Sequence, residues 1–142
     1  MYYVAHVHQE GKHWLAEFPD APGCQTFADS PDELAATAQE ALEGWLEAHL
    51  VDGDAPPRAK LRHKTPARKR AIKVPVSPTL SAVLSIRWAR QDRGWSQKQL
   101  AERVGVSQQQ IAKLENPDEN PTLRSLTEVA KALGLRLDVT FA

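Results

Sequence analysis

Two stretches within the first 28 residues alternate between apolar and polar positions, which is the period of a β-strand. Residues 2–9 and 14–18 both alternate and are rich in β-forming residues, and a short connector around Gly11 separates them. This pattern predicts a β-hairpin. A dense turn signal at residues 19–23 is followed by residues 24–28, which we expect to form a third strand.

From residue 30 onward the apolar residues recur at helical spacing. Ser30 is a favourable N-cap, Pro31 suits the first helical position, and Glu33 follows in the first turn. The apolar stripe of this helix consists of Leu34, Ala38, Ala41, Leu42, Trp45, Leu46 and Leu50. The order β-β-β-α predicts an α+β unit in which the helix covers one face of the sheet. Residues 71–76 alternate again and are compatible with an extra strand at the sheet edge, where Pro75 is tolerated.

Residues 78–134 carry helical patterns, and the central segment of this region is residues 94–116. A helix is expected from Pro78 to about residue 93. The central segment then contains two helix starts with the capping-box pattern, Ser96 with Gln99 and Ser107 with Gln110. Gly105 lies between them, where a helix must end and a positive φ is favoured. Two short capped helices joined by a tight turn are typical of a helix-turn-helix.

The last part of the chain predicts one further helix and then a strand. The helix begins near Pro121 and ends at Gly134, and residues 135–142 alternate strictly, with Leu135 and Phe141 on the apolar side. A single strand after a helical domain has no sheet of its own, and unpaired strand edges seek partners. We therefore expect residues 135–142 to pair with the same segment of a second chain, giving a homodimer or a higher even oligomer.

The net charge of zero hides a strong asymmetry along the chain. Residues 1–57 contain eleven acids and a single cation, whereas residues 58–142 contain seventeen cations and seven acids. Residues 58–73 alone hold eight cations and no acid, which is typical of a solvated connector but also suits an arm that contacts DNA phosphates or folds back on the acidic half. We thus expect a domain at 1–57, a basic linker at 58–76 and a second domain at 77–142.

Two stretches of sequence resemble known families. The pattern S-Q-x-x-L-A-x-x-V-G-V-S-Q-x-x-I-x-x-L-E, which starts at Ser96, resembles the XRE/Cro-type repressor helix-turn-helix. The motifs F-P-D-x-P-G-C at residues 18–24 and E-A-L-E-x-W-L at residues 40–46 resemble the HicB antitoxin family. That resemblance implies a partial RNase H-like fold that binds and blocks HicA, a small basic toxin that cleaves mRNA. HicB antitoxins often carry a C-terminal DNA-binding domain.

The helix-turn-helix pattern predicts a set of DNA-contacting residues. With Ile111 and Leu114 inward, the outward positions include Gln108, Gln109 and Lys113, and glutamine can bond adenine N6 and N7 together. Gln97 resembles the phosphate-contacting glutamine of the XRE family. The full set is Gln97, Ser107, Gln108, Gln109, Gln110, Lys113, Asn116 and Arg124. Pro117 departs from the family pattern, which usually has Gly at the position after Asn116.

Acids on the outer side of the first helix are the candidate toxin-binding residues, namely Glu33, Glu40, Glu43 and Glu47. A plain solvated acidic face is the alternative. The function that these patterns predict is a cytoplasmic antitoxin that neutralises a HicA-like toxin and represses its own operon by binding palindromic DNA. A one-component regulator with a ligand-sensing first domain is the alternative.

We expect no enzymatic activity, no metal and no cofactor. A ribonuclease of the RNase H type needs several carboxylates converging on metal ions. The acids on or beside the predicted strands are few, namely Glu10, Glu17, Asp20 and Asp29. The single Cys24 excludes an internal disulfide and suits a reducing compartment, and no apolar run approaches the ~20 residues needed to span a bilayer.

Overall fold

A computed structural model describes residues 1–53, 55–60 and 62–141. The chain divides into two compact units, Met1–Ser77 and Pro78–Ala142. The basic segment 58–76 therefore groups with the first unit. Among the described residues, no helix combines the length and apolar character that crossing a membrane requires.

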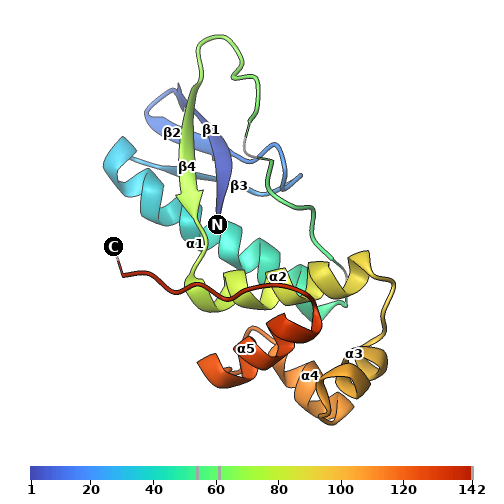
Figure 1. Ribbon diagram of the computed structural model, residues 1–142. Coiled ribbons are helices and arrows are strands. Elements are labelled where there is room, and N and C mark those ends of the chain that lie inside the picture. The colour runs from blue at the N-terminus through green and yellow to red at the C-terminus, as the bar shows by residue number, and fades with distance from the viewer. Residues whose placement is uncertain (54, 61, 142) are drawn as a thin grey trace. The chain divides into compact units, whose positions relative to one another are not determined.

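The first unit contains a four-stranded antiparallel sheet (Figure 1). Its strands are β1 (Tyr2–Glu10), β2 (His13–Glu17), β3 (Gln25–Ala28) and β4 (Arg70–Pro75), in the spatial order β3-β2-β1-β4. The predicted hairpin, third strand and extra edge strand are all confirmed. In the register of the sheet, Tyr3 lies opposite Val74 in β4, and Val7 lies opposite Ala16 in β2 and Arg70 in β4.

Helix α1 (Pro31–Val51) packs against one face of this sheet (Figure 1). The hydroxyl of Ser30 accepts a hydrogen bond from the Glu33 amide at 3.2 Å, so the predicted N-cap is confirmed. The stripe residues Leu34, Ala38, Leu42, Leu46 and Leu50 are all buried, whereas Ala41 and Trp45 are half-buried. Residues Tyr3, Ala5 and Val7 alternate along β1 and are buried with them. Burial of these apolar side chains is the main source of stability of the unit.

The segment that follows α1 is bound to the first unit by polar contacts around Asp20. The Asp20 carboxylate accepts a hydrogen bond from the Lys60 amide at 2.7 Å and contacts His63 Nε2 at 2.6 Å. The Tyr3 hydroxyl donates to the Pro57 carbonyl at 2.7 Å, and the Lys69 ammonium pairs with Glu17. Burial, together with the nearby Asp20 charge, raises the pKa of Tyr3, so its hydroxyl remains a donor. Three roles were considered for residues 58–73, and these contacts match the third, in which the segment folds back on the acidic half.

This arrangement changes the meaning of the charge asymmetry. Counted over residues 1–77, the first unit holds eleven acids and nine cations, and the second unit holds seven acids and nine cations. The two units are therefore nearly neutral. The acids and cations that separate along the sequence are brought together within the first unit.

The second unit consists of α2 (Pro78–Asp92), α3 (Gln97–Val104), α4 (Gln108–Leu114) and α5 (Leu123–Ala132). Its core is formed by one cluster of buried apolar residues contributed by all four helices and by the end of α5: Ile86, Ala89, Leu100, Ala101, Ile111, Leu114, Leu126, Val129 and Leu133. The predicted helical domain is thus confirmed, and its small core explains why it needs polar contacts as well.

The predicted strand at residues 135–142 does not form within this chain. Residues 135–141 belong to no sheet, and Ala142 lies outside the described residues. Leu137 packs against the core of the second unit, while Leu135, Val139 and Phe141 are exposed, Phe141 at 97%. A strand is defined by a hydrogen-bonded neighbour, and the second unit offers none in its described part. The alternation in the sequence indicated a segment with one apolar and one polar side, but it did not specify which strand would pair with it.

Candidate DNA interface and protein-docking surface

Helices α3 and α4 are held by two complete capping boxes. Ser96 accepts a hydrogen bond from the Gln99 amide at 3.1 Å, and Gln99 Oε1 accepts one from the Ser96 amide at 2.8 Å. Ser107 and Gln110 repeat the exchange at 3.2 and 3.1 Å. Between the boxes, Gly105 adopts a φ of 83° at the C-cap of α3, a conformation that costs little only for glycine. These local contacts set the start of both helices and the turn that joins them.

The exposed side of α4 carries the predicted base-reading residues. Ile111 and Leu114 are buried, whereas Gln108, Gln109 and Lys113 are exposed. Ser107 and Gln110 are exposed too, but each side chain accepts a hydrogen bond in the capping box. Gln108 and Gln109 have no such role in the described structure. They are therefore the side chains of the first turn that are best placed for contacts with bases.

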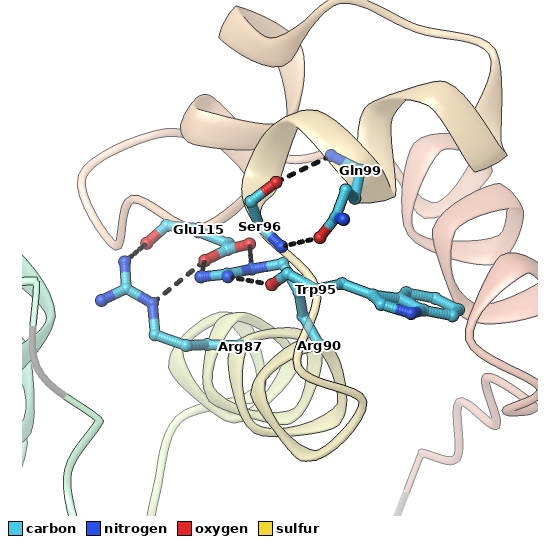
Figure 2. A network of polar contacts seen from close by, with 6 residues as sticks. All are labelled: Arg87, Arg90, Trp95, Ser96, Gln99 and Glu115. Carbon is cyan, nitrogen blue, oxygen red and sulfur yellow. Dashed lines mark hydrogen bonds and ion pairs between the residues drawn. The ribbon is translucent and has the colours of Figure 1, made fainter.

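A buried ionic network anchors the C-terminal end of α4 to α2 (Figure 2). The Glu115 carboxylate, which is fully buried, accepts hydrogen bonds from Arg90 Nε at 2.7 Å, Arg90 Nη2 at 2.8 Å and Arg87 Nε at 3.1 Å. Arg87 Nη2 also donates to the Glu115 carbonyl at 3.3 Å. A buried charge is tolerated only when it is paired and hydrogen-bonded, and here both arginines satisfy one carboxylate.

The network extends to the start of α3. Arg90 Nη1 donates to the carbonyl of Trp95, the residue that precedes the Ser96 cap, at 2.8 Å (Figure 2). Arg90 therefore joins α2, α4 and the entry to α3, and fixes the two helices of the motif relative to each other. The sequence pattern did not single out Arg87, Arg90 and Glu115 as residues that hold the two helices of the motif. The glutamate of the L-E pair at the end of the motif was the available signal, but its two partners are 25 and 28 residues away.

The remaining predicted DNA contacts occupy helix ends and one turn. Gln97 is half-buried in the first turn of α3, and Arg124 is exposed in the first turn of α5. Asn116 is exposed, and its side-chain oxygen accepts a hydrogen bond from the Asp118 amide at 2.9 Å. That bond shapes the turn around Pro117. The turn that follows α4 thus uses the oxygen of Asn116 internally.

Two further cations gather on an aromatic ring beside α3. The guanidinium carbon of Arg103 lies 4.0 Å from the centre of the Trp95 ring, and that of Arg93 lies 5.7 Å from it. Cations over an indole face are attracted by its quadrupole. Arg103 is exposed at the C-terminal end of α3, so it adds a positive charge to the edge of the motif that the sequence pattern did not single out.

The outer side of α1 is acidic, as predicted. Helix α1 contains five acids and no lysine or arginine. Glu33, Glu40 and Glu47 are exposed, whereas Glu43 is half-buried and accepts a hydrogen bond from the Ser77 amide at 2.6 Å. Glu43 therefore helps to hold the end of the first unit and is less available to a partner than Glu33 and Glu40.

The four acids considered for nuclease chemistry do not gather at one place. Each contacts a different basic group: Glu10 contacts His8 at 3.7 Å, Glu17 contacts Lys69, Asp20 contacts His63, and Asp29 contacts His13 at 3.1 Å. The hydrogen bond from Lys69 lowers the pKa of Glu17. Within the described ranges, no three histidine, cysteine or acidic side chains are grouped so as to hold a metal ion. The expectation that the chain is not an enzyme stays a prediction.

Comparison with known proteins assigns both units to families. The family model of the HicB-like antitoxin of bacterial toxin–antitoxin systems matches residues 2–75, and a helix-turn-helix model matches residues 86–139. Antitoxin HicB 1 of Photorhabdus laumondii subsp. laumondii is 27% identical over 132 residues, which cover 93% of this chain and 80% of that protein. Antitoxin HipB of Escherichia coli K12 is 34% identical over 61 residues, covering 43% of this chain and 68% of HipB.

A search of solved structures found a chain of a HicA3 and HicB3 toxin–antitoxin complex with a TM-score of 0.44 and 21% identity, covering 55% of this chain and all of that one. The family models and the related antitoxins are the stronger result. They agree with the two units and with the capped helix pair described above. The chain belongs to the HicB-like antitoxin family and carries a DNA-binding helix-turn-helix domain in its second unit.

Proposed function

We propose that this antitoxin neutralises a small basic HicA-like ribonuclease toxin through its first unit and represses its own operon through its second. The observation that carries the proposal is the joining, in one chain, of a HicB-like unit with an acidic helix face to a helix-turn-helix whose α4 is exposed and firmly anchored. The protein acts by binding and has no catalytic role of its own. Its place of action is the cytoplasm.

The acidic side of α1 is the proposed docking surface for the toxin. Glu33, Glu40 and Glu47 are exposed on one helix that carries no cation, so the local potential is negative. Complementary charges steer two proteins together and exclude partners of like charge. A basic toxin would be attracted to this surface. Binding of the antitoxin would then cover the positive charges with which the toxin contacts RNA.

The proposed DNA interface is centred on the first turn of α4. Gln108 and Gln109 would read base edges in the major groove, while Lys113 would reach a base or a phosphate. Gln97, Asn116 and Arg124 would contact the phosphate backbone at the margins. Ser107 and Gln110 hold the start of the helix in place and touch DNA from the same turn.

A single second unit is a weak DNA binder by its charge. Its nine cations exceed its acids by only two, and affinity for DNA depends largely on neutralised phosphates. A two-fold assembly would double the contacts and read a palindrome. We propose that residues 135–141, with Leu135, Val139 and Phe141 exposed, pair with their copy in a second chain. Removal of residues 136–142 should then give monomers in sedimentation, and an unchanged dimer would rule out this pairing.

The test of the toxin-binding role is co-expression of the full chain with a small basic HicA-like toxin. Reversing charge in the triple variant Glu33→Lys, Glu40→Lys, Glu47→Lys should abolish co-purification and restore growth arrest by the toxin. The matched control reverses three exposed acids of the second unit, Glu102→Lys, Glu119→Lys and Glu128→Lys, and should leave neutralisation intact. Full neutralisation by the α1 variant would place the toxin interface elsewhere.

A further inference from the structure

A cavity of about 390 Å³ lies at one end of the sheet in the first unit. Strand β4 begins at Arg70, opposite Val7, so β1 continues past the end of β4 for three more residues, His8 to Glu10. The turn that leads into β4 lies beside this free edge. The cavity between them is lined by Val7, His8, Gln9, Trp14, Arg68, Lys69 and Arg70. It is separate from the acidic side of α1 and from the helix-turn-helix.

Three consecutive cations dominate the lining of this cavity. Lys69 is paired with Glu17, which leaves Arg68 and Arg70 as exposed guanidinium groups. In the part of the chain that the structure describes, neither guanidinium has a hydrogen bond or an ion pair. Each guanidinium group is a planar fork of donors, a shape that matches the oxygens of a phosphate.

The backbone at Arg68 is held in an unfavourable conformation. Its φ of 67° makes it the one residue other than glycine with a positive φ in the described structure. Asparagine, aspartate and glycine tolerate this region, whereas a long side chain there costs free energy. The turn is closed by a hydrogen bond from the Lys69 amide to the Pro66 carbonyl at 3.2 Å. Strained residues of this kind cluster at ligand-binding sites, where the strain sets the direction of a side chain.

Trp14 and His8 complete the lining. Trp14 is half-buried in β2 opposite Gln9. His8 Nδ1 is buried without a hydrogen-bond partner, and the Nε2 atom of the same ring lies 3.7 Å from Glu10. A cationic site beside an indole face combines the two groups that bind unpaired nucleotides, because the cations hold the phosphate and the base stacks on the ring.

We propose that this cavity binds a phosphodiester of a single-stranded nucleic acid, with Arg68 and Arg70 on the phosphate and an unpaired base stacked on Trp14. Lys69 keeps the turn in place through Glu17 and adds positive charge. The site gives the antitoxin a hold on single-stranded RNA or DNA that is independent of its helix-turn-helix. In the presence of a ribonuclease toxin, such a site would keep a strand bound to the first unit while the toxin is blocked.

The test uses the full chain with Gln108→Ala and Gln109→Ala, so that base contacts through α4 are weakened in every sample. Fluorescence anisotropy measures binding of labelled ten-nucleotide RNA and DNA strands of one mixed sequence, and of the matching duplex. The variant Arg68→Gly, Arg70→Ser removes both guanidiniums while glycine keeps the positive φ without strain. Its affinity for the single strands should fall at least about tenfold, and the slope of its salt dependence should decrease by about 0.7, the value for one neutralised phosphate of a single strand.

A matched pair of variants controls for overall charge. Arg62→Ser with Lys64→Ser removes two exposed cations from the same basic segment, outside the cavity, and should change affinity less than twofold. Trp14→Leu should weaken binding about tenfold, whereas Trp14→Phe retains an aromatic face and should recover most of it. Circular dichroism of each variant checks that the sheet is intact.

The RNA and DNA arms identify the source of the strand, and tighter binding of RNA assigns a role to the 2′-hydroxyl. Equal losses from the Arg68/Arg70 and Arg62/Lys64 pairs would overturn the proposal, because binding would then depend on total charge. Equal affinity for the duplex would overturn it as well. Loss of toxin binding in the Arg68/Arg70 variant, without any single-strand binding by the parent, would show the cavity to be a protein interface instead.

Discussion

The two units hold their exposed functional surfaces in different ways. In the second unit, α4 is only seven residues long, and a helix of this length is not stable by itself. Its position is set by capping boxes at one end and by the buried Arg87–Glu115–Arg90 network at the other. In the first unit, α1 is 21 residues long and is held by a row of buried leucines and an alanine.

This difference suits what each surface is proposed to recognise. A hydrogen bond to a base edge requires a narrow range of donor–acceptor distances and angles. The helix that carries Gln108 and Gln109 therefore has to be rigidly placed. Charge attraction falls off slowly with distance, so the acids of α1 need only be exposed on the correct side. The comparison predicts that buried polar contacts matter most in the second unit, and the following experiments test it.

The largest effect is expected from Glu115→Gln. The substitution leaves Arg87 and Arg90 without the charge that compensates them, and breaking a buried ion pair costs about 3–5 kcal/mol. The second unit should unfold at much lower urea concentration and operator binding should be lost, while toxin neutralisation persists. Amide hydrogen exchange, read separately for each unit, measures the change. Glu119→Gln, on an exposed residue of the following turn, is the matched control. Similar exchange in both variants would show that the network does not stabilise the fold.

The next effect concerns the exposed glutamines. Each bidentate contact with adenine contributes about 1–3 kcal/mol to binding. The double variant Gln108→Ala, Gln109→Ala should therefore give no gel shift at protein concentrations at which the wild type saturates the operator. Stability and toxin neutralisation should not change, because both side chains are exposed. Gln91→Ala, which alters an exposed residue of α2, provides the comparison. Loss of neutralisation together with DNA binding would mean that the two functions are not separable.

Removal of a helix cap should have a smaller effect that differs between the units. Ser107→Ala and Ser30→Ala each remove an N-cap that contributes about 1 kcal/mol. The loss at Ser107 falls on a short helix whose first turn is the proposed DNA contact, so operator affinity should drop. The loss at Ser30 falls on a long helix with a large buried stripe, so toxin affinity should stay within twofold. Titration of both ligands against both variants gives the comparison, and equal losses would remove the proposed distinction.

The smallest effect is a difference in pH dependence. All five histidines lie within residues 1–63, so the second unit has none. Burial, together with the neighbouring His63 and Lys69, lowers the pKa of His6 below its usual 6.5, an effect that Glu17 opposes. The folded first unit therefore binds fewer protons than the unfolded chain. This contribution to stability is present above pH 6.5 and is lost as the pH falls through the folded-state pKa.

Denaturation midpoints between about pH 7 and pH 5 should therefore fall for the first unit and stay flat for the second. The variant His6→Gln removes the titrating group and should flatten the first unit as well. His13→Gln, at an exposed histidine, is the control and should retain the wild-type slope. The Glu17–Lys69 pair adds a separate loss at lower pH, because the pKa of Glu17 is also held below its usual value. An unchanged slope in His6→Gln would assign the pH dependence to another group.

Local features of the chain were predictable because their physical causes are local. Ser96, Ser107 and Gly105 act on backbone groups within a few residues, so the capped helix pair could be predicted with its outward glutamines. The leucine stripe of α1 and the alternation in β1 each carry their own period. The strand order and the attachment of β4 to β1 were open, because a strand pattern does not name its neighbour. Residues 135–141 belong to no sheet within this chain, and their pairing with a second chain stays a prediction.

The sequence by itself determined two units of different class, most of their helices and strands, and the exposed glutamines of α4. Only the tertiary structure decided which charges are paired. Asp20 meets Lys60 and His63 across 40 or more residues, and Glu115 meets Arg87 and Arg90 across 25 or more. The contacts of Asp20 hold the basic segment on the first unit. Arg68 and Arg70 line the same cavity as Trp14. Charge pairing depends on distance in space, which the packing of the apolar core sets and the order of residues does not show.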